Sequence, residues 1–138
     1  MTAVATARRA RSSWVVVSGA VLVAVVVNLT IYVLGRAVGA TFELTVAGDG
    51  RSTVDAATVA GFTAVPLLVG LGLAALLGPR WSWVYPTAFV VGPALAVATI
   101  LVMTVPADLD TASTITLACM HLALVPVVVL ALRALRRP

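Results

Sequence analysis

The uncharged apolar run from Trp14 to Leu34 is the feature that most constrains this chain. A helix needs about 20 residues to cross the hydrocarbon core of a bilayer, and this run is long enough. Within it only Ser18, Asn28 and Thr30 are strongly polar. Comparable runs recur three times, so we predict an all-α membrane protein: a four-transmembrane-helix bundle forming a single domain over 1–138, with spans at about 14–35, 56–77, 83–105 and 111–132.

Composition supports membrane embedding and argues against a nucleic-acid partner. Of 138 residues, 62% are hydrophobic and only 10% are charged, too few charges to cover a soluble surface. The net charge is +4, but every basic residue is an arginine and most lie at the ends of apolar runs, which is typical of topology signals. The single cysteine, Cys119, excludes an internal disulfide and a Cys-X-X-Cys redox pair.

The basic N-terminal segment before Trp14 resembles the start of a signal peptide. The apolar stretch of a signal peptide is about 7–15 residues long and ends at a small-residue cleavage site. Here the run is longer and continues to Arg36, so we expect a retained first span.

The segment 41–54, between the first two spans, has the pattern of a short β-hairpin. Phe42, Leu44 and Val46 alternate with polar residues, and the turn-forming sequence 48–50 separates them from a second extended piece at 51–54. Two strands alone are marginal in water, so this hairpin must rest on the ends of the helices. A flexible loop is the alternative.

Local signals set the boundaries of the later spans. Asp55 is a predicted N-cap of the second span, Gly78 and Pro79 end it, and Pro66 lies in its middle. Ala88, Gly92 and Ala96 of the third span recur at four-residue spacing, which lets another helix approach closely.

The charges predict the orientation in the membrane. With both termini cytoplasmic, the hairpin is extracellular and all acidic residues lie outside, together with Arg36 and Arg51. The other seven arginines then lie inside: Arg8, Arg9, Arg11, Arg80, Arg133, Arg136 and Arg137. This asymmetry follows the positive-inside rule.

Four residues are the candidate ligand-binding group: Asn28, Tyr32, Arg36 and His121. The first three are spaced by four and so share one helix face. Counting about 1.5 Å per residue places Asn28 about 12 Å below Arg36, and His121 about 15 Å below the start of the fourth span. Thr63 and Thr99 come to the same outer half, so the sequence predicts a polar cluster inside the bundle.

The cluster has two interpretations. Polar side chains at membrane depth turn inward and pair, and helix packing alone requires such bonds, which is the interpretation we favour for His121. An ionisable residue inside a membrane is also a candidate ligand or proton site.

No catalytic residue, metal ion or cofactor is predicted. The spans contain no carboxylate, and one histidine with one methionine, Met103, is a weak ligand set. A lipid-modifying enzyme that uses Arg36, Tyr32 and His121 with the outer acids is a distant alternative.

The sequence therefore favours a non-catalytic structural or partner-binding membrane component. Its expected partners are membrane lipids, a second copy of the chain or another membrane protein. The alternative is a binder or carrier of a small amphipathic ligand or lipid at the outer polar cluster, with Pro66 shaping the cavity.

Several short motifs also resemble a known family. They are Asn28 with Tyr32 and Gly35-Arg36, the segment 42–45, Pro66-Leu67-Leu68 with Gly70, and Met120-His121-Leu122. Together they resemble a family of small four-span membrane proteins from high-GC Gram-positive bacteria, a domain of unknown function. The resemblance implies a bacterial source and a plasma-membrane location, and it implies no activity.

Overall fold

The computed structural model of the chain describes residues 2–46 and 50–136, with the side chains of 12–45 and 50–136. The elements follow in the order α1 (Thr2–Ala37), β1 (Glu43–Val46), β2 (Gly50–Thr53), α2 (Ala56–Leu77), α3 (Val84–Thr99), the π-helical turn η1 (Ile100–Thr104) and α4 (Thr111–Arg136). The four helices and the hairpin between the first two of them are confirmed.

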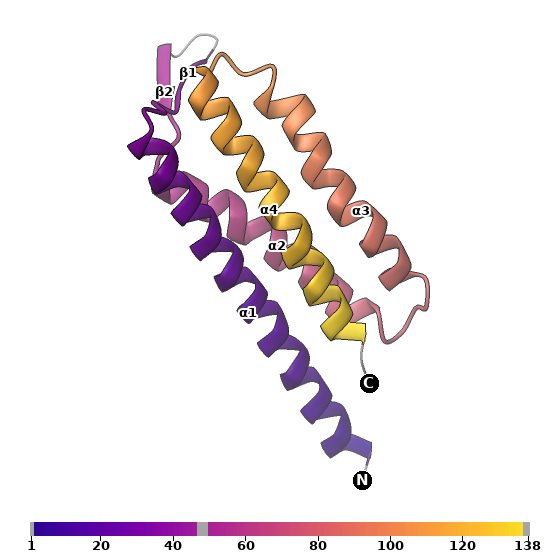
Figure 1. Cartoon of the computed structure of the whole chain (residues 1–138). Coiled ribbons are helices and arrows are strands. Elements are labelled where there is room, and N and C mark those ends of the chain that lie inside the picture. Colours follow the sequence, from indigo (N-terminus) through magenta and orange to yellow (C-terminus); the bar gives the residue numbers. More distant parts are fainter. Residues whose placement is uncertain (1, 47–49, 137–138) are drawn as a thin grey trace.

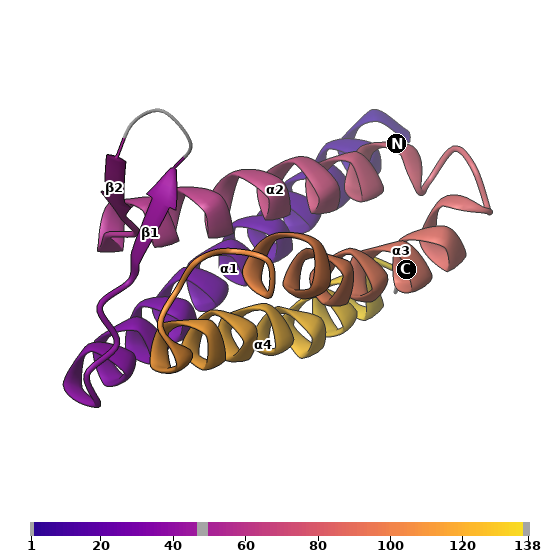
Figure 2. The same ribbon diagram turned by 90° about the horizontal axis from the view of Figure 1, so that it is seen from above.

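The helices form a bundle that carries the hairpin at one end (Figure 1). The start of α1 and the end of α4 lie at the opposite end, which we call the terminal end; the other is the hairpin end. Helix α1 packs on α2 and α4, and α3 packs mainly on α4. Helices α2 and α3 follow each other in the chain yet make few mutual contacts, and Figure 2 shows the space between their ribbons.

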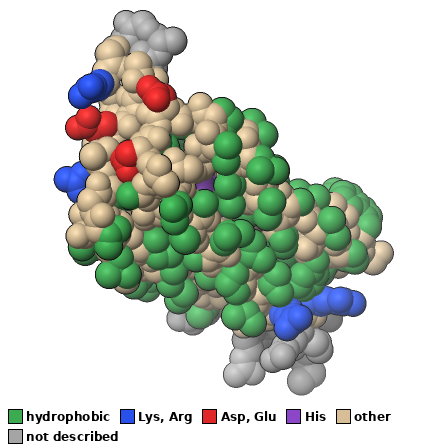
Figure 3. Space-filling model, turned by 45° about the horizontal axis from the view of Figure 1, so that its top comes forward, with side chains coloured by type: hydrophobic (Ala, Val, Ile, Leu, Met, Phe, Trp, Pro, Cys, Tyr) green, Lys and Arg blue, Asp and Glu red, His purple; other side chains and the backbone are tan. Residues whose placement is uncertain are grey.

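Many large apolar side chains are exposed on the surface of the molecule, as contact with lipid requires. Large side chains such as Phe62 and Val102 are more than two-thirds exposed, at 76% and 71%. Four helices are long and apolar enough to cross a membrane. Figure 3 shows hydrophobic side chains over the middle of the molecule and charged ones towards its ends. The chain is therefore a multi-pass membrane protein whose helices contact lipid.

The enclosed interior is divided into two apolar clusters. The larger lies towards the terminal end, where α1, α2 and α4 meet, and includes Val17, Leu71 and Leu132. The smaller lies at the hairpin end and is built around Phe42 and Met120. A hydrogen bond from Tyr85 Oη to Leu135 O, 3.1 Å long, also joins the start of α3 to the end of α4.

Two helix boundaries have clear local causes. Asp55 caps α2, as predicted, because its Oδ1 accepts a 2.7 Å hydrogen bond from Thr58 N. The predicted third span corresponds to α3 and η1 together. The π turn, in which Val105 N donates to Ile100 O over 2.8 Å, was not predicted.

The hairpin is a two-stranded antiparallel sheet in which Glu43 pairs with Thr53 and Val46 with Gly50. An exposed ion pair, Arg51 to Glu43 at 3.5 Å, crosses it. The predicted turn residues Gly48 and Asp49 lie outside the described part of the chain. So do Arg137 and the side chains of Arg8, Arg9 and Arg11, which contributed to the predicted orientation.

Candidate functional site

The Asp110 carboxylate ties the segment that leads into the hairpin to the start of α4. Asp110 Oδ2 accepts hydrogen bonds from Thr41 Oγ1 (2.6 Å) and Thr41 N (3.2 Å), while its Oδ1 accepts from Ser113 N (2.8 Å). The hydroxyl of Ser113 also donates to this carboxylate. Hydrogen bonds from Ser113 and then Thr41 hold the pKa of the Asp110 carboxyl well below its ordinary value.

Phe42 closes the hairpin end of the bundle. Its ring is fully buried among the helices, and its backbone has a φ of 57°, a left-handed conformation that is unusual for a bulky residue. Two hydrogen bonds hold this backbone: Phe42 N donates to Ser113 Oγ over 2.8 Å, and Phe42 O accepts from Val54 N over 2.9 Å. The anchored hairpin therefore holds the Phe42 ring inside the bundle.

A cavity of about 430 Å³, which we call the polar cavity, extends from the hairpin into the bundle. Every helix, the π turn and β1 contribute to its wall. Its polar lining residues are Asn28, Thr58, Thr63, Thr99, Thr104 and His121. The structure thus brings two of the four candidate residues, Asn28 and His121, to one cavity, together with both threonines expected at their depth.

Asn28 is the most constrained polar residue of this wall. Its side chain is only 3% exposed, and its Nδ2 donates a 2.9 Å hydrogen bond to Thr63 Oγ1 of α2. Among the described residues, its Oδ1 is the buried side-chain polar atom that lacks a hydrogen-bond partner. An unpaired buried acceptor costs about 1–3 kcal/mol, so a donor that reached this oxygen would be bound favourably.

His121 lies on α4 and is partly buried in the wall of the same cavity. Its Nδ1 is 2.8 Å from Leu117 O of its own helix. A carbonyl oxygen only accepts, so Nδ1 carries the proton, and Nε2 of the neutral ring is then an acceptor. The hydrogen bond that the structure gives His121 is therefore within its own helix, and Nε2 is the ring nitrogen left to interact with other groups.

Tyr32 and Arg36 are not among the residues that line the polar cavity. The Tyr32 ring packs on Phe42, with centroids 4.7 Å apart, and Arg36 Nη1 donates to Thr41 O over 3.0 Å. Both side chains therefore support the segment that leads into the hairpin. A ligand-binding role for either residue stays a prediction.

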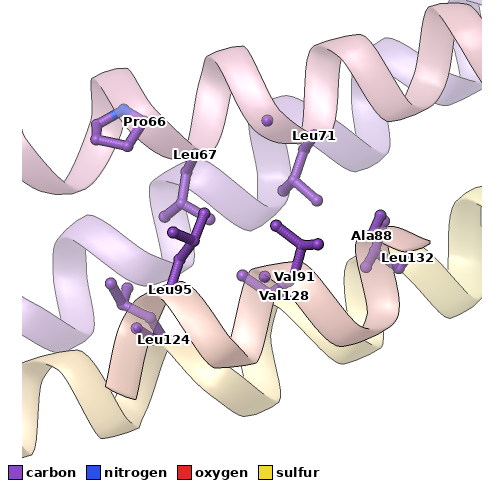
Figure 4. A pocket seen from close by; sticks show the side chains of 12 residues that line it. Pro66, Leu67, Leu71, Ala88, Val91, Leu95, Leu124, Val128 and Leu132 are labelled. Atoms are coloured by element: carbon purple, nitrogen blue, oxygen red, sulfur yellow. The ribbon is translucent and has the colours of Figure 1, made fainter. Parts of the chain in front are cut away.

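A second, apolar groove of about 270 Å³ lies among α2, α3 and α4 (Figure 4). Leu67 and Leu71 approach it from α2, Val91 and Leu95 from α3, and Leu124, Val128 and Leu132 from α4. Pro66 and Leu124 line both this groove and the polar cavity, so the two spaces adjoin.

The small residues of the third span serve contacts within the chain. Ala88, Gly92 and Ala96 line the apolar groove, and a Cβ on Gly92 would lie only 2.8 Å from Val128 Cγ1 of α4. Close approach of α3 to α4 therefore uses this face. Self-association through this face stays a prediction.

In the part of the chain with described side chains, no group of three His, Cys, Asp or Glu residues is placed to hold a metal ion. Cys119 is a free, exposed cysteine.

Sequence reasoning missed the apolar groove, Thr104 and the closing role of Phe42. The groove arises because α2 and α3 pack poorly on each other, which depends on the packing of all four helices. The unbroken apolar composition of 100–103 gives no signal for a π turn.

Comparisons with known proteins place the chain in a family but assign it no activity. It matches no curated protein and no solved structure at a significant level. A family model described as a family of unknown function, DUF6069, matches residues 6–138. Because that match spans almost the whole sequence, the chain belongs to this family of uncharacterised proteins.

Proposed function

We propose that this protein binds a small amphipathic ligand or lipid, without catalysis, in the polar cavity and the adjoining apolar groove. The observation that carries the proposal is the buried, unpaired Oδ1 of Asn28 in a cavity wall at membrane depth. A ligand with its polar end in the cavity and its chain in the groove matches the lining of both spaces.

We further propose a bacterial plasma-membrane location with both termini in the cytoplasm. The described acidic residues lie at the hairpin end, where β1 and the loops before α2 and α4 meet. Arg80 follows α2 and Arg133 and Arg136 end α4, so these cations lie at the terminal end. Cations favour the cytoplasmic side, which supports this orientation. The bacterial source rests on the sequence resemblance alone.

A partner-binding role is the second candidate, and the hairpin favours it. All four residues of β2 are exposed, and a strand at the edge of a sheet offers unpaired backbone groups to another chain. In this case the cavity would be filled by bulk lipid without preference.

Native mass spectrometry of the protein released from lipid nanodiscs tests the ligand proposal. The nanodiscs contain phosphatidylglycerol doped equally with three oleyl amphiphiles that differ only in head group. We expect one defined adduct on the wild-type protein. A protein that retains none of the added amphiphiles and no lipid above the nonspecific background would overturn the proposal and favour partner binding.

Two glycines of α2 supply a matched pair of variants. A Cβ added at Gly70, which lines the apolar groove, would meet no atom within 4 Å, so Gly70→Leu adds bulk at the groove. Gly61 also faces open space but does not line either space, so Gly61→Leu is the control. We expect Gly70→Leu to lose the adduct and Gly61→Leu to keep it. Equal retention by both variants would show that the adduct is bound elsewhere.

His121→Leu separates ligand binding from packing. If His121 contacts the ligand, the variant keeps its fold and loses most of the adduct. If it serves only packing, a modest loss of stability is expected with the adduct retained.

A further inference from the structure

We infer that the ligand of the polar cavity is a neutral lipid alcohol, a molecule whose head group is a hydroxyl that donates hydrogen bonds. This inference rests on the proposed function and names the chemical class of the ligand. It follows from two properties of the cavity wall. Several of its polar atoms are hydrogen-bond acceptors without a donor from the ligand side, and its described lining contains no permanently charged side chain.

Three polar residues of the wall already donate a hydrogen bond within the protein, and each has an acceptor atom that faces no donor from the described residues. Asn28 uses one of its two amide N–H groups to bond Thr63, and its Oδ1 is the atom that has no partner at all, an acceptor. His121 uses Nδ1–H on Leu117 O, which leaves Nε2 as an acceptor in the neutral ring. Thr99 uses its hydroxyl hydrogen on Leu95 O over 2.7 Å, which leaves only lone pairs on its oxygen. A ligand that donates hydrogen bonds therefore complements this wall.

The described wall holds no permanently charged side chain, which disfavours ionic head groups. Among the described residues that line the polar cavity, none is Asp, Glu, Lys or Arg. A phosphate would meet no arginine or lysine there, with His121 as the one titratable residue of this described lining, and an ammonium group would meet no carboxylate. Burying an unpaired charge is far more costly than burying a hydroxyl that keeps a hydrogen bond. A neutral donor is the head group that meets both conditions.

The side chain of Asn28 can adjust to such a ligand. Its Oδ1 is enclosed by the protein, but the terminal torsion of an asparagine is soft, so a modest turn presents the oxygen to the cavity. The amide nitrogen turns together with the oxygen, so the bond to Thr63 limits this turn to a small angle. The apolar chain of the ligand then follows the groove towards Leu71 and Leu132.

The test compares oleyl alcohol, oleyl methyl ether and oleyl phosphate, the three amphiphiles in the nanodiscs described above. The ether keeps the oxygen and the chain but cannot donate, and the phosphate adds charge. We expect the alcohol to be retained about tenfold more than the ether, the ratio for one well-made hydrogen bond in a buried site. We expect the phosphate to be retained less than the alcohol.

Asn28→Leu removes the amide at similar size, and the alcohol-to-ether ratio should then fall towards one. Thr30→Val is the control, since Thr30 is exposed on the same helix and its hydroxyl donates to Val26 O one turn earlier in that helix. The ratio of this variant should match that of the wild type. If Asn28→Leu does not fold, the wild-type ratio alone decides the matter.

Two results separate the inference from the proposed function. Retention of ether or phosphate equal to that of the alcohol, lost in Gly70→Leu, would overturn the lipid-alcohol inference and leave the ligand-binding proposal standing. Preferential retention of phosphatidylglycerol in a Gly70-dependent manner would do the same. Retention of none of the amphiphiles or lipids would overturn both.

Discussion

Thr41 and Asp110 lie 69 positions apart in the chain and are joined by two hydrogen bonds to a single carboxylate oxygen, from Thr41 Oγ1 at 2.6 Å and Thr41 N at 3.2 Å. The same carboxylate accepts from Ser113 at the start of α4. One side chain thus caps a helix and holds the segment that precedes the hairpin. The charge of the Asp110 carboxylate should therefore affect the stability of the hairpin end.

Asp110→Asn should lower the thermal-denaturation midpoint at neutral pH, and the effect should depend on pH. Because its folded-state pKa is depressed, the Asp110 carboxylate stabilises the fold fully above its unfolded pKa of about 3.9. That contribution is lost as the pH falls below this value towards the folded pKa. The midpoints of wild type and variant in detergent should therefore differ most near neutrality and converge as the pH falls below about 4.

Asp108→Asn is the control for this prediction. Asp108 lies in the same loop but accepts only one hydrogen bond from a described residue, from Thr45 Oγ1 at 3.1 Å. Its substitution should lower the midpoint less than Asp110→Asn does at neutral pH, because it breaks a single hydrogen bond. A constant gap between wild type and Asp110→Asn over this pH range would contradict the assigned role of the carboxylate.

At Phe42, we expect the glycine variant to be more stable than the alanine variant, which reverses the usual order. Phe42→Ala removes a fully buried ring and should cost about 3–5 kcal/mol of unfolding free energy. Phe42→Gly removes the same ring but relieves the left-handed backbone at φ 57°, which glycine adopts without strain. The glycine variant should therefore be the more stable of the two. Chemical-denaturation midpoints of both variants in detergent would measure this, and a less stable glycine variant would count against a strained Phe42.

Gly35 should tolerate no side chain, because α1 and α4 approach closely there. An added Cβ would lie 2.5 Å from Thr116 Cγ2 and 2.7 Å from Thr116 Oγ1. We expect Gly35→Ala to destabilise the fold by about 1–3 kcal/mol. Thr116→Ala in the same chain should recover part of that loss, whereas Gly61→Ala, which meets open space, should be neutral or stabilising. Thermal melts of these three variants and the wild type measure this, and the prediction fails if Gly35→Ala melts like Gly61→Ala.

Thiol labelling tests the proposed orientation. In a Cys119→Ala background, a cysteine at Ser52 on exposed β2 should react with an impermeant maleimide in intact cells. A cysteine at the exposed Ala134 of α4 should react only after permeabilisation. The opposite pattern would reverse the topology.

The fold was largely predictable because its main signals are local. A run such as Trp14–Leu34 has the length that a bilayer demands, and the alternation around Leu44 indicates a strand whatever its surroundings. The conformation of Phe42 had no such signal, since nothing in the residue type favours positive φ. It is imposed by contacts with Ser113 and Val54, which are distant in sequence.

The depth of the candidate residues in the membrane was predictable, but the directions in which their side chains point around the helix axis were less so. Counting helical rise placed Asn28 and His121 at one level, and both line the polar cavity. Residues four apart also rotate by about 40° about the helix axis, so Arg36 is turned by about 80° from Asn28. Tyr32 and Arg36 meet the segment 41–42 instead, because the chain folds back there over the end of α1.

The attachment of the hairpin to α4 has a consequence for the order of synthesis. A ribosome makes Asn28 and Thr63 early, so these two can pair as soon as the second helix enters the bilayer. Asp110, Ser113 and His121 belong to the last part of the chain to be made. Until that part leaves the translocon, Phe42 has no Ser113 to hold it and the polar cavity has no fourth wall. A chain arrested before Asp110 would therefore display an unanchored hairpin and a half-built cavity to the quality-control proteases of the membrane.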